Sequence, residues 1–252
     1  MPDTSLPVFA VERLPGTGPF VLGGPEGKHA AAVRRLRPGE LLLLSDGAGG
    51  LARCEVVEAA KDSLRLAVLD VAHVEQPRLR VRLVQALVKG ERGELAVELA
   101  TEAGVDAVLP WRAARSIAKW DDGPRGAKAL NRWRSTAAQA AKQARRAWTP
   151  QVDEPVSTKR LAEVVRGADG AVVLHESAAT PLAGAPLPAS GELLVVVGPE
   201  GGIGAEELAV LTEAGARPVR LGPSVLRAST AGAVALGALG VLTDRWNVTQ
   251  GD

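Results

Sequence analysis

The chain has few of the residues from which disulfides and structural metal sites are built. Its 252 residues include one cysteine, Cys54, and three histidines that lie far apart, His29, His73 and His175. A single cysteine cannot form an internal disulfide, and a structural zinc site needs about four ligands at short spacings. We therefore expect neither a disulfide nor a metal site, and we expect Cys54 to be a small, half-buried strand residue.

The chain also lacks long apolar runs. None is long enough to span a membrane, and the N-terminal segment has no basic region followed by an apolar core. A composition of 46% hydrophobic and 23% charged residues is typical of a globular protein, and the length suffices for two domains. These features predict a cytoplasmic protein with a substantial core.

The small net charge of +1 conceals a strongly basic segment. Between Trp111 and Arg146 only Asp121 and Asp122 are acidic, whereas ten residues are basic. The basic residues are Arg112, Arg115, Lys119, Arg125, Lys128, Arg132, Arg134, Lys142, Arg145 and Arg146. Because Lys and Arg bind phosphates regardless of base sequence, this segment predicts nucleic-acid binding; the alternative is a solvated helix face. The tryptophans at positions 111, 120, 133 and 148 are either stacking platforms for bases or, for most of them, core residues.

Hydrophobic patterning divides the chain at about residue 75. Residues 1–75 contain alternating stretches at 40–44, 51–57 and 64–71 that are separated by turn residues, which predicts a small β domain. Residues 76–252 contain continuous apolar strands that alternate with helices, which predicts an α/β domain with a parallel sheet covered on both faces. We expect these strands at 81–88, 105–109, 171–175 and 193–197, and the helices at 92–103, 126–147, 158–167, 205–214 and 228–243.

Two glycine-rich segments follow strands near the C-terminus. They read LLVVVGPEGGIGAEE over 193–207 and VRLGPSVLRASTAGAVALGAL over 219–239. The glycine spacing at 198–204 does not fit a dinucleotide fingerprint, and the segment 22–29 does not fit a phosphate-binding loop. Glycines let the main chain approach a ligand closely, and ligands of α/β sheets bind at the carboxyl ends of strands. The pair therefore predicts a cofactor pocket lined by backbone.

The same two segments resemble the signature of the bacterial 16S rRNA (uracil-N3)-methyltransferase family, which belongs to the knotted SPOUT class. Further matches follow the family's order along nearly the whole chain. Upstream of the two glycine segments they are 89–92, 101–105, 115–116, 143–146 and Pro150. Near the N-terminus, in a part similar to the family's RNA-binding domain, they are His29, Val33, Arg35, 38–40 and 46–47. Two positions depart from the family's usual residues. Ser229 stands where the family often has glutamate, and Leu99 stands where it often has lysine.

The resemblance implies both a fold and an activity. The fold would be a SPOUT-type parallel sheet with a C-terminal trefoil knot over 76–252, preceded by a PUA-like β-barrel domain for RNA binding over 1–75. The activity would be methylation of N3 of a uridine near the decoding centre of 16S rRNA, in the 30S subunit, with S-adenosyl-L-methionine as cofactor and a homodimer as the working unit. The alternatives are another SPOUT enzyme that methylates tRNA or a ribose 2′ oxygen, and a non-catalytic RNA-binding protein of ribosome assembly.

The matched motifs also suggest residues for the site. The resemblance places the methyl donor against residues of the two glycine loops, namely Val197, Gly198, Glu200, Gly201, Gly202, Leu221, Gly222, Ser224, Leu226, Ser229 and Thr230. Arg227 is the candidate cation for a negatively charged uracil, and Glu200 is a second catalytic candidate; the alternative is an ion pair between these two. The expected RNA contacts are Lys28, Arg35, Arg37, Lys89, Arg92, Arg115, Arg132, Arg134, Lys142, Arg145 and Arg146.

The last expected helix offers a means of pairing two copies. Ala231, Ala235, Ala238 and Leu239 lie along one stripe of it, and small residues allow two helices to approach closely. We therefore expect this stripe to contact the same helix of a second copy. The alternative is that the stripe packs in the core of its own chain.

Overall fold

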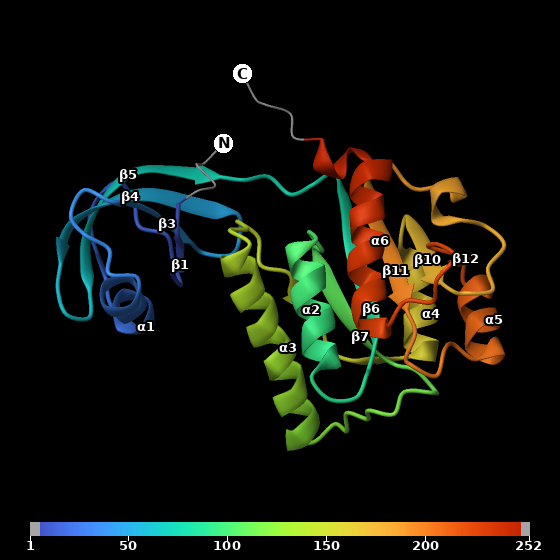
Figure 1. Cartoon of the computed structure of the whole chain (residues 1–252). Helices are drawn as coiled ribbons and strands as arrows, with labels where there is room; N and C mark the ends of the chain where they lie inside the picture. The colour runs from blue at the N-terminus through green and yellow to red at the C-terminus, as the bar shows by residue number, and fades with distance from the viewer. Residues whose placement is uncertain (1–5, 248–252) are drawn as a thin grey trace. The chain divides into compact units, whose positions relative to one another are not determined.

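The computed structural model describes residues 6–247, which form two units (Figure 1). The first unit contains the described residues up to Gln76 together with Ala141–Thr149. The second unit contains Pro77–Ala140 and the described residues from Pro150 onward. The segment Ala141–Thr149 therefore returns to the N-terminal unit, although the sequence pattern assigned it to the α/β domain.

The first unit is built on one five-stranded sheet with the order β1-β3-β4-β5-β2. Its strands are β1 (Val8–Ala10), β2 (Gly18–Leu22), β3 (Leu41–Ser45), β4 (Gly50–Ala59) and β5 (Leu64–His73). The pairs β3–β4, β4–β5 and β2–β5 are antiparallel, while β1 runs parallel to β3. Between β2 and β3 lie helix α1 (Gly24–Lys28) and a π-helical turn (His29–Val33). A small β domain is thus confirmed, and β3, β4 and β5 are the strands that alternation predicted.

The interior of this sheet corrects one expectation. Cys54 on β4 is fully buried, not half-buried, and it packs with Phe9, Leu42 and Leu64. Burial, with a smaller contribution from the negative charge of Asp70, raises the pKa of the Cys54 thiol to about 12. The thiol is therefore neutral and unreactive at physiological pH.

The returning segment Ala141–Thr149 is bound to this unit by polar contacts. The ammonium of Lys142 lies 2.7 Å from a carboxylate oxygen of Glu26. The indole of Trp148 donates a hydrogen bond of 2.7 Å to the carbonyl oxygen of Val74. Both contacts are made to residues of the β domain. They explain why the end of α3 (Pro124–Gln143) and the residues after it belong to this unit and not to the α/β unit.

The second unit contains a parallel sheet with the order β12-β10-β11-β6-β7-β8, in which β9 also pairs with β7. The strands are β6 (Leu79–Ala86), β7 (Ala107–Arg112), β8 (Gln151–Val152), β9 (Val156–Ser157), β10 (Gly170–Leu174), β11 (Gly191–Val197) and β12 (Arg217–Val219). The helices are α2 (Arg92–Glu102), α3 (Pro124–Gln143), α4 (Thr158–Gly167), α5 (Ala205–Glu213) and α6 (Ala228–Leu242). The last three residues of α3, 141–143, belong to the first unit. This is the predicted α/β arrangement.

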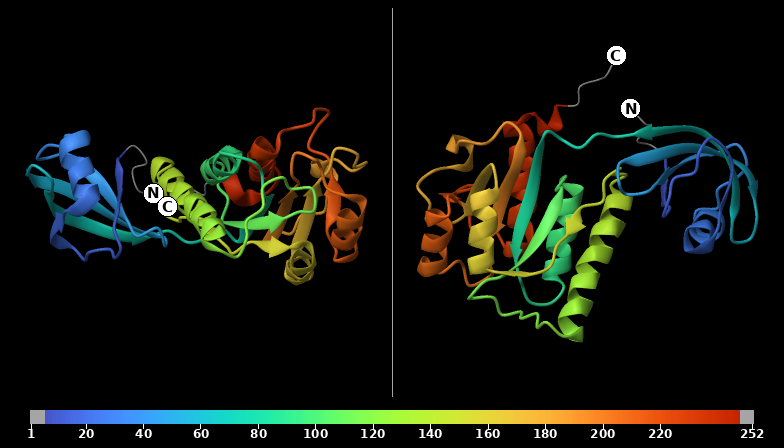
Figure 2. Two further views of the ribbon diagram at one scale, coloured as in Figure 1. Left: turned by 90° about the horizontal axis from the view of Figure 1, so that it is seen from below. Right: turned by 180° about the vertical axis from the view of Figure 1, so that it is seen from behind.

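Helices cover both faces of this sheet, so successive strand residues enter two different cores (Figure 2). On β6, Leu83 packs on the side of α2, α3 and α6, whereas the next residue, Val84, packs on the side of α4 and α5. Val195 and Val196 on β11 divide in the same way. Burial on both faces is the reason why these strands are continuous apolar runs without alternation.

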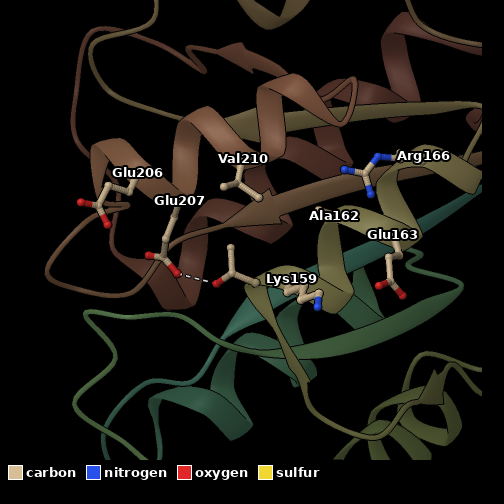
Figure 3. Close-up of a pocket in the computed structure, with 8 residues that line it drawn as sticks. Lys159, Ala162, Glu163, Arg166, Glu206, Glu207 and Val210 are labelled. Atoms are coloured by element: carbon tan, nitrogen blue, oxygen red, sulfur yellow. Dashed lines mark hydrogen bonds between the residues drawn. The ribbon is translucent and has the colours of Figure 1, made fainter.

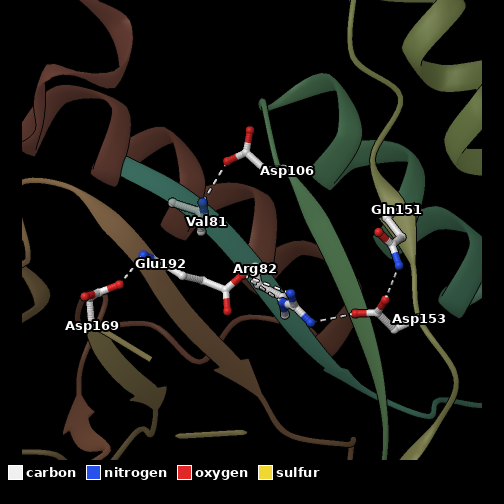
Figure 4. A network of polar contacts seen from close by, with 7 residues as sticks. All are labelled: Val81, Arg82, Asp106, Gln151, Asp153, Asp169 and Glu192. Carbon is white, nitrogen blue, oxygen red and sulfur yellow. Dashed lines mark hydrogen bonds and ion pairs between the residues drawn. The ribbon is translucent and has the colours of Figure 1, made fainter. Parts of the chain in front are cut away.

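The amino-terminal edge of the sheet carries a network of ion pairs (Figure 4). Arg82 on β6 lies 2.7 Å from Asp153 and 2.9 Å from Glu192 on β11. Beside it, Arg245 pairs with Asp106 at 2.8 Å. Burial raises the pKa of Asp153 above its usual value, although the positive charge of Arg82 acts in the opposite direction. These charges hold neighbouring strands together at the edge away from the glycine loops.

The stripe on α6 corrects another expectation. Ala231, Ala235 and Leu239 are buried in the core of their own chain, between α6 and the sheet, so this stripe is not a contact between two copies. Within residues 6–247, no helix combines the length and the apolar character that crossing a membrane requires. The trefoil knot stays a prediction.

Candidate active site

A cavity of about 650 Å³ lies at the carboxyl edge of the parallel sheet. Its walls are the loop 197–203 after β11, the loop 220–228 after β12, residues 174–176 after β10, and Arg92, Arg115 and Ala231. Because β10 lies between β11 and β12 in the sheet, the three loops leave the same edge side by side. The two glycine segments predicted from the sequence thus line one site.

Most of the residues suggested for cofactor binding line this cavity. They are Val197, Gly198, Glu200, Gly201, Gly202, Leu221, Gly222, Ser224 and Leu226. Ser229 and Thr230 do not line it. The side chain of Ser229 is buried in the first turn of α6, and the hydroxyl of Thr230 donates a hydrogen bond of 3.2 Å to the carbonyl oxygen of Arg227. These two residues are therefore placed to shape the start of α6.

Glycine is required at two positions of the loop after β11. Gly202 has a φ of +71°, and its N–H donates to the carbonyl of Pro199 at 2.9 Å, which closes a tight turn. A Cβ atom at Gly198 would lie 2.6 Å from the side chain of Ile203. A side chain at Gly202 would be strained by this φ, and one at Gly198 would have to displace the side chain of Ile203, so the loop shape depends on these glycines.

The two catalytic candidates face the cavity separately. Arg227 is the residue just before α6, and its exposed side chain forms no ion pair with any residue between 6 and 247. Glu200 is also exposed and accepts a hydrogen bond of 3.4 Å from the backbone N–H of Lys89. An ion pair between Arg227 and Glu200 is therefore wrong as an interpretation, and both side chains are available to a ligand.

Other residues at the cavity were assigned differently or missed by the sequence analysis. Arg92 and Arg115, expected to contact RNA, line the cavity, and the Arg115 guanidinium donates a hydrogen bond of 3.2 Å to the carbonyl oxygen of Gly201. His175 and Arg220 also line it, and Nδ1 of His175 accepts a hydrogen bond from the N–H of Ser177. His175 directly follows β10, so the rule that ligands bind at carboxyl ends of strands was the signal that could have identified it.

Three of the cations expected to bind RNA are paired within the protein. Arg132 lies 3.1 Å from Glu94, Arg134 lies 2.9 Å from Glu154, and Lys142 is held by Glu26. Arg134 also donates a hydrogen bond to a backbone carbonyl oxygen. By contrast, Lys28, Arg35, Arg37 and Lys89 are exposed. Some of the basic residues therefore form ion pairs within the protein, and others are exposed to solvent. A count of charges in the sequence does not show this difference.

Two of the four tryptophans at positions 111, 120, 133 and 148 are buried in the interior, and the other two are half-buried. Trp111 and Trp133 are almost completely buried, and the ring centre of Trp120 lies 4.9 Å from that of Trp133. Trp148 packs edge-on against His73 in the β domain. Core packing is thus confirmed for Trp111 and Trp133, and these buried rings are not stacking platforms for bases.

Comparison with known proteins gives matches along both units. The family model of the RNA methyltransferase domain matches residues 74–240, and that of the RNA methyltransferase PUA domain matches residues 22–69. Ribosomal RNA small subunit methyltransferase E of Mycobacterium bovis is 53% identical over 176 residues, which cover 68% of this chain and 67% of that protein. The protein of the same name from Bacillus subtilis is 31% identical over 161 residues, covering 64% of this chain and 62% of that protein.

Solved structures give the same result. Ribosomal RNA small subunit methyltransferase E from Neisseria gonorrhoeae, solved with S-adenosylmethionine, has a TM-score of 0.81 and 26% identity, covering 94% of this chain and 98% of that one. A methyltransferase from Legionella pneumophila, solved with the same cofactor, has a TM-score of 0.82, 26% identity and the same coverage. The family matches and these structures confirm the predicted fold class with its PUA-like domain. The chain therefore belongs to the family of RNA methyltransferases that includes the ribosomal RNA small subunit methyltransferases E.

Proposed function

We propose that this protein transfers a methyl group from S-adenosyl-L-methionine to N3 of a uridine near the decoding centre of 16S rRNA, in the small ribosomal subunit and in the cytoplasm. The observation that carries the proposal is the single cavity formed by the two glycine loops after β11 and β12. The names of the relatives support rRNA of the small subunit as the substrate, and the solved structures that contain S-adenosylmethionine support the cofactor.

The residues of the cavity fit such a cofactor. Its volume of about 650 Å³ lies within the range of small-molecule sites. The backbone of Gly201 lies close to Arg115, since a Cβ added at Gly201 would be 3.3 Å from the Cβ of Arg115. In the opposite loop, no atom lies within 4 Å of a Cβ added at Gly222, so the space beside it is open. Backbone groups of these loops, with Val197, Leu221 and Leu226, would hold the adenosine part. When bound, the cofactor supplies a methyl group that is already activated on a sulfonium, so no metal is needed.

The side chains in the cavity suit a weakly acidic nucleophile. The N3 proton of uracil must leave before or while N3 accepts the methyl group, and the negative charge that it leaves behind is shared by N3 and the two carbonyl oxygens until the N–CH3 bond is complete. The unpaired guanidinium of Arg227 would stabilise this charge, because a fixed cation acts most strongly where charge appears during the reaction. Glu200 would either accept the proton or order its own loop, and we assign no single base.

Substrate binding is assigned to exposed cations on both units. Lys28, Arg35 and Arg37 lie in or beside α1 and the π-helical turn of the first unit, which we propose as the RNA-binding domain over 1–75. Lys89 belongs to the second unit, proposed as the knotted methyltransferase domain over 76–252. Arg132, Arg134 and Lys142 would contact RNA only by exchanging an existing ion pair. Arg145 and Arg146 stay candidates as well.

We also propose a homodimer, but through a different face of α6 from the one that the sequence suggested. Val234 and Val241 are seven residues apart in the helix and are 47% and 77% exposed. Two apolar residues at this spacing lie on one helix face, which a second copy would cover. Native mass spectrometry of the purified chain tests this, and a monomer that retains full activity would contradict it.

A methyl-transfer assay tests the function. Radiolabelled S-adenosylmethionine is incubated with the protein and with purified small subunits, naked 16S rRNA or tRNA, and the labelled nucleoside is identified after digestion. We expect 3-methyluridine, and more of it from small subunits than from naked RNA, because folded RNA is recognised mainly by shape. Label on a ribose oxygen or on tRNA alone would favour a different RNA methyltransferase. Tight cofactor binding without any transfer would favour a non-catalytic assembly protein.

A further inference from the structure

A buried carboxylate, Glu207 in the first turn of α5, is absent from the lining of the cavity formed by the glycine loops and only 8% exposed. With Thr158 it lines a second, smaller cavity of about 420 Å³ between α4 and α5 (Figure 3). The Oε1 atom of Glu207 accepts two hydrogen bonds, one of 3.0 Å from the N–H of Ala114 and one of 2.6 Å from the hydroxyl of Thr158. Such a group is expensive to bury, and its place at the positive end of a helix only partly offsets this cost. Its presence therefore requires a reason beyond packing.

The hydroxyl of Thr158 has a fixed direction. The indole N–H of Trp111 donates to this hydroxyl at 3.1 Å, and an indole can only donate. The single hydroxyl proton of Thr158 is consequently left for Glu207. The result is a directed chain of hydrogen bonds that connects β7, the first turn of α4 and the first turn of α5.

The other bond to Glu207 reaches the cavity formed by the glycine loops. Ala114 belongs to a tight turn, closed by a hydrogen bond of 3.0 Å from the N–H of Ser116 to the carbonyl of Ala113. The next residue, Arg115, donates to the carbonyl oxygen of Gly201 at 3.2 Å, and its Cβ and carbonyl are within 3.5 Å of the point where a Gly201 Cβ would be. The turn 113–116 thus lies directly on the glycine loop, and Glu207 is the side chain that holds the N–H of this turn.

We propose that Glu207, oriented by Thr158, is a positioning residue of the methyl-donor pocket. It fixes the turn 113–116, and through Arg115 it sets the position of the Gly201 carbonyl and the shape of the loop 198–204. Glu207 itself does not line this cavity. This inference rests on the proposed function for the identity of the ligand, but the link from Glu207 to the glycine loop exists without a ligand.

Two pairs of variants separate positioning from stability. Glu207→Ala should weaken S-adenosylmethionine binding, measured by calorimetry, by about ten- to hundredfold, since small displacements of a preorganised site have effects of this size. Glu207→Gln keeps an oxygen that accepts both hydrogen bonds and should remain within about threefold of the wild-type protein. Thr158→Val should weaken binding and Thr158→Ser should not. Leu211→Ala, a fully buried residue on the same helix, is the matched control, which should destabilise the protein and leave the affinity unchanged.

A double-mutant cycle with Arg115→Ala gives the decisive result. If Glu207 acts through Arg115, the affinity lost in the double variant will equal that lost with Arg115→Ala alone. Additive losses would show that Glu207 does not act through Arg115, and an unchanged affinity in Glu207→Ala would show that Glu207 is only structural; either result overturns the proposal.

Hydrogen exchange without ligand should show faster exchange of 198–204 in Glu207→Ala than in Leu211→Ala, and equal exchange would overturn the link. Should the wild-type protein bind no S-adenosylmethionine while this exchange difference persists, the proposed function fails and the link from Glu207 to the loop stands.

Discussion

The two edges of the parallel sheet use charged residues in opposite ways. At the amino-terminal edge, Arg82 and Arg245 are largely buried and each is saturated by carboxylates or backbone carbonyls. At the carboxyl edge, Arg227 and Glu200 are exposed and have no ion-pair partner among residues 6–247. Groups that are already paired stabilise strands, whereas groups left unpaired can respond to a ligand. The comparison predicts that mutations at one edge change stability and those at the other change activity.

Replacing Arg227 by alanine should have the largest effect. Methyl transfer to small subunits should fall by about 10²- to 10³-fold, as when one group that stabilises a developing charge is removed. The free energy of unfolding in urea should change by less than about 0.5 kcal/mol, because an exposed, unpaired side chain is lost. Arg227→Lys keeps the positive charge but loses the planar set of donors, so its rate of methyl transfer should lie between those of the wild-type protein and Arg227→Ala. A large loss of stability in Arg227→Ala would contradict the prediction that charged residues at the carboxyl edge of the sheet affect activity and not stability.

Replacing Arg82 by methionine should have the opposite effect, a loss of stability without a loss of cofactor affinity. Asp153 and Glu192 would be left partly buried without their cation, which should lower the free energy of unfolding by about 3 kcal/mol at neutral pH. Cofactor affinity should be unchanged in the molecules that remain folded. Urea unfolding and calorimetry at one temperature measure both quantities, and a variant that is fully stable would contradict the role of the network.

The pH dependence of this variant follows from Asp153. Its pKa in the folded protein is raised above the usual value, mainly by burial, and removing Arg82 raises it further. The folded state therefore binds more protons than the unfolded state between the two pKa values, and stability falls as the pH rises through this interval. The deficit of Arg82→Met relative to the wild-type protein should accordingly shrink as the pH is lowered from neutral towards the range in which carboxylates titrate. A deficit that is independent of pH would point to lost packing of the arginine stem.

The glycine loop offers a smaller change at the carboxyl edge. In Gly201→Val the new Cβ would lie 3.3 Å from that of Arg115, so the loop or the arginine must move. We expect a loss of about 2 kcal/mol in S-adenosylmethionine binding, measured by calorimetry, which is typical of overpacking a tight contact. Gly167→Val at the end of α4 is a matched control, because nothing lies within 4 Å of an added Cβ there. Unchanged affinity in Gly201→Val would remove this loop from the site.

The strand, loop and helix pattern of the two glycine segments was sufficient to predict where the cavity is. Loops that leave parallel strands meet at one edge, and the apolar runs identified the strands. The pattern did not predict that His175, after a third strand, joins them, since strand order follows from topology and not from spacing. It also missed the bonds to Glu207, whose partners Thr158 and Ala114 are 49 and 93 residues away in the sequence.

Charge patterning was similarly limited to local information. The run of basic residues between 111 and 146 was visible in the sequence, but Arg132, Arg134 and Lys142 are paired with carboxylates that no periodicity connects to them. The return of Ala141–Thr149 to the β domain depends on contacts with Glu26 and Val74, which lie more than a hundred and more than seventy residues before their partners. Periodicity in a single sequence predicts which face of a helix or strand is buried, but not which other helix or strand packs against that face.

The smallest expected effect extends the comparison from the sheet edges to the residues proposed to bind RNA. Arg37 is exposed in the first unit, and the structure gives its side chain no ion-pair partner between residues 6 and 247, whereas Arg134 is held by Glu154 and by the carbonyl of Val152. A free cation that contacts a phosphate releases about one counterion, so Arg37→Ala should reduce the slope of log affinity against log salt by about one. Arg134 must first lose its carboxylate partner, so Arg134→Ala should change the slope by less than half as much. Binding of 16S rRNA fragments at several salt concentrations measures both slopes. Equal changes would show that an ion pair within the protein does not withhold a cation from RNA, and the distinction between paired and unpaired charges would then apply only to the sheet.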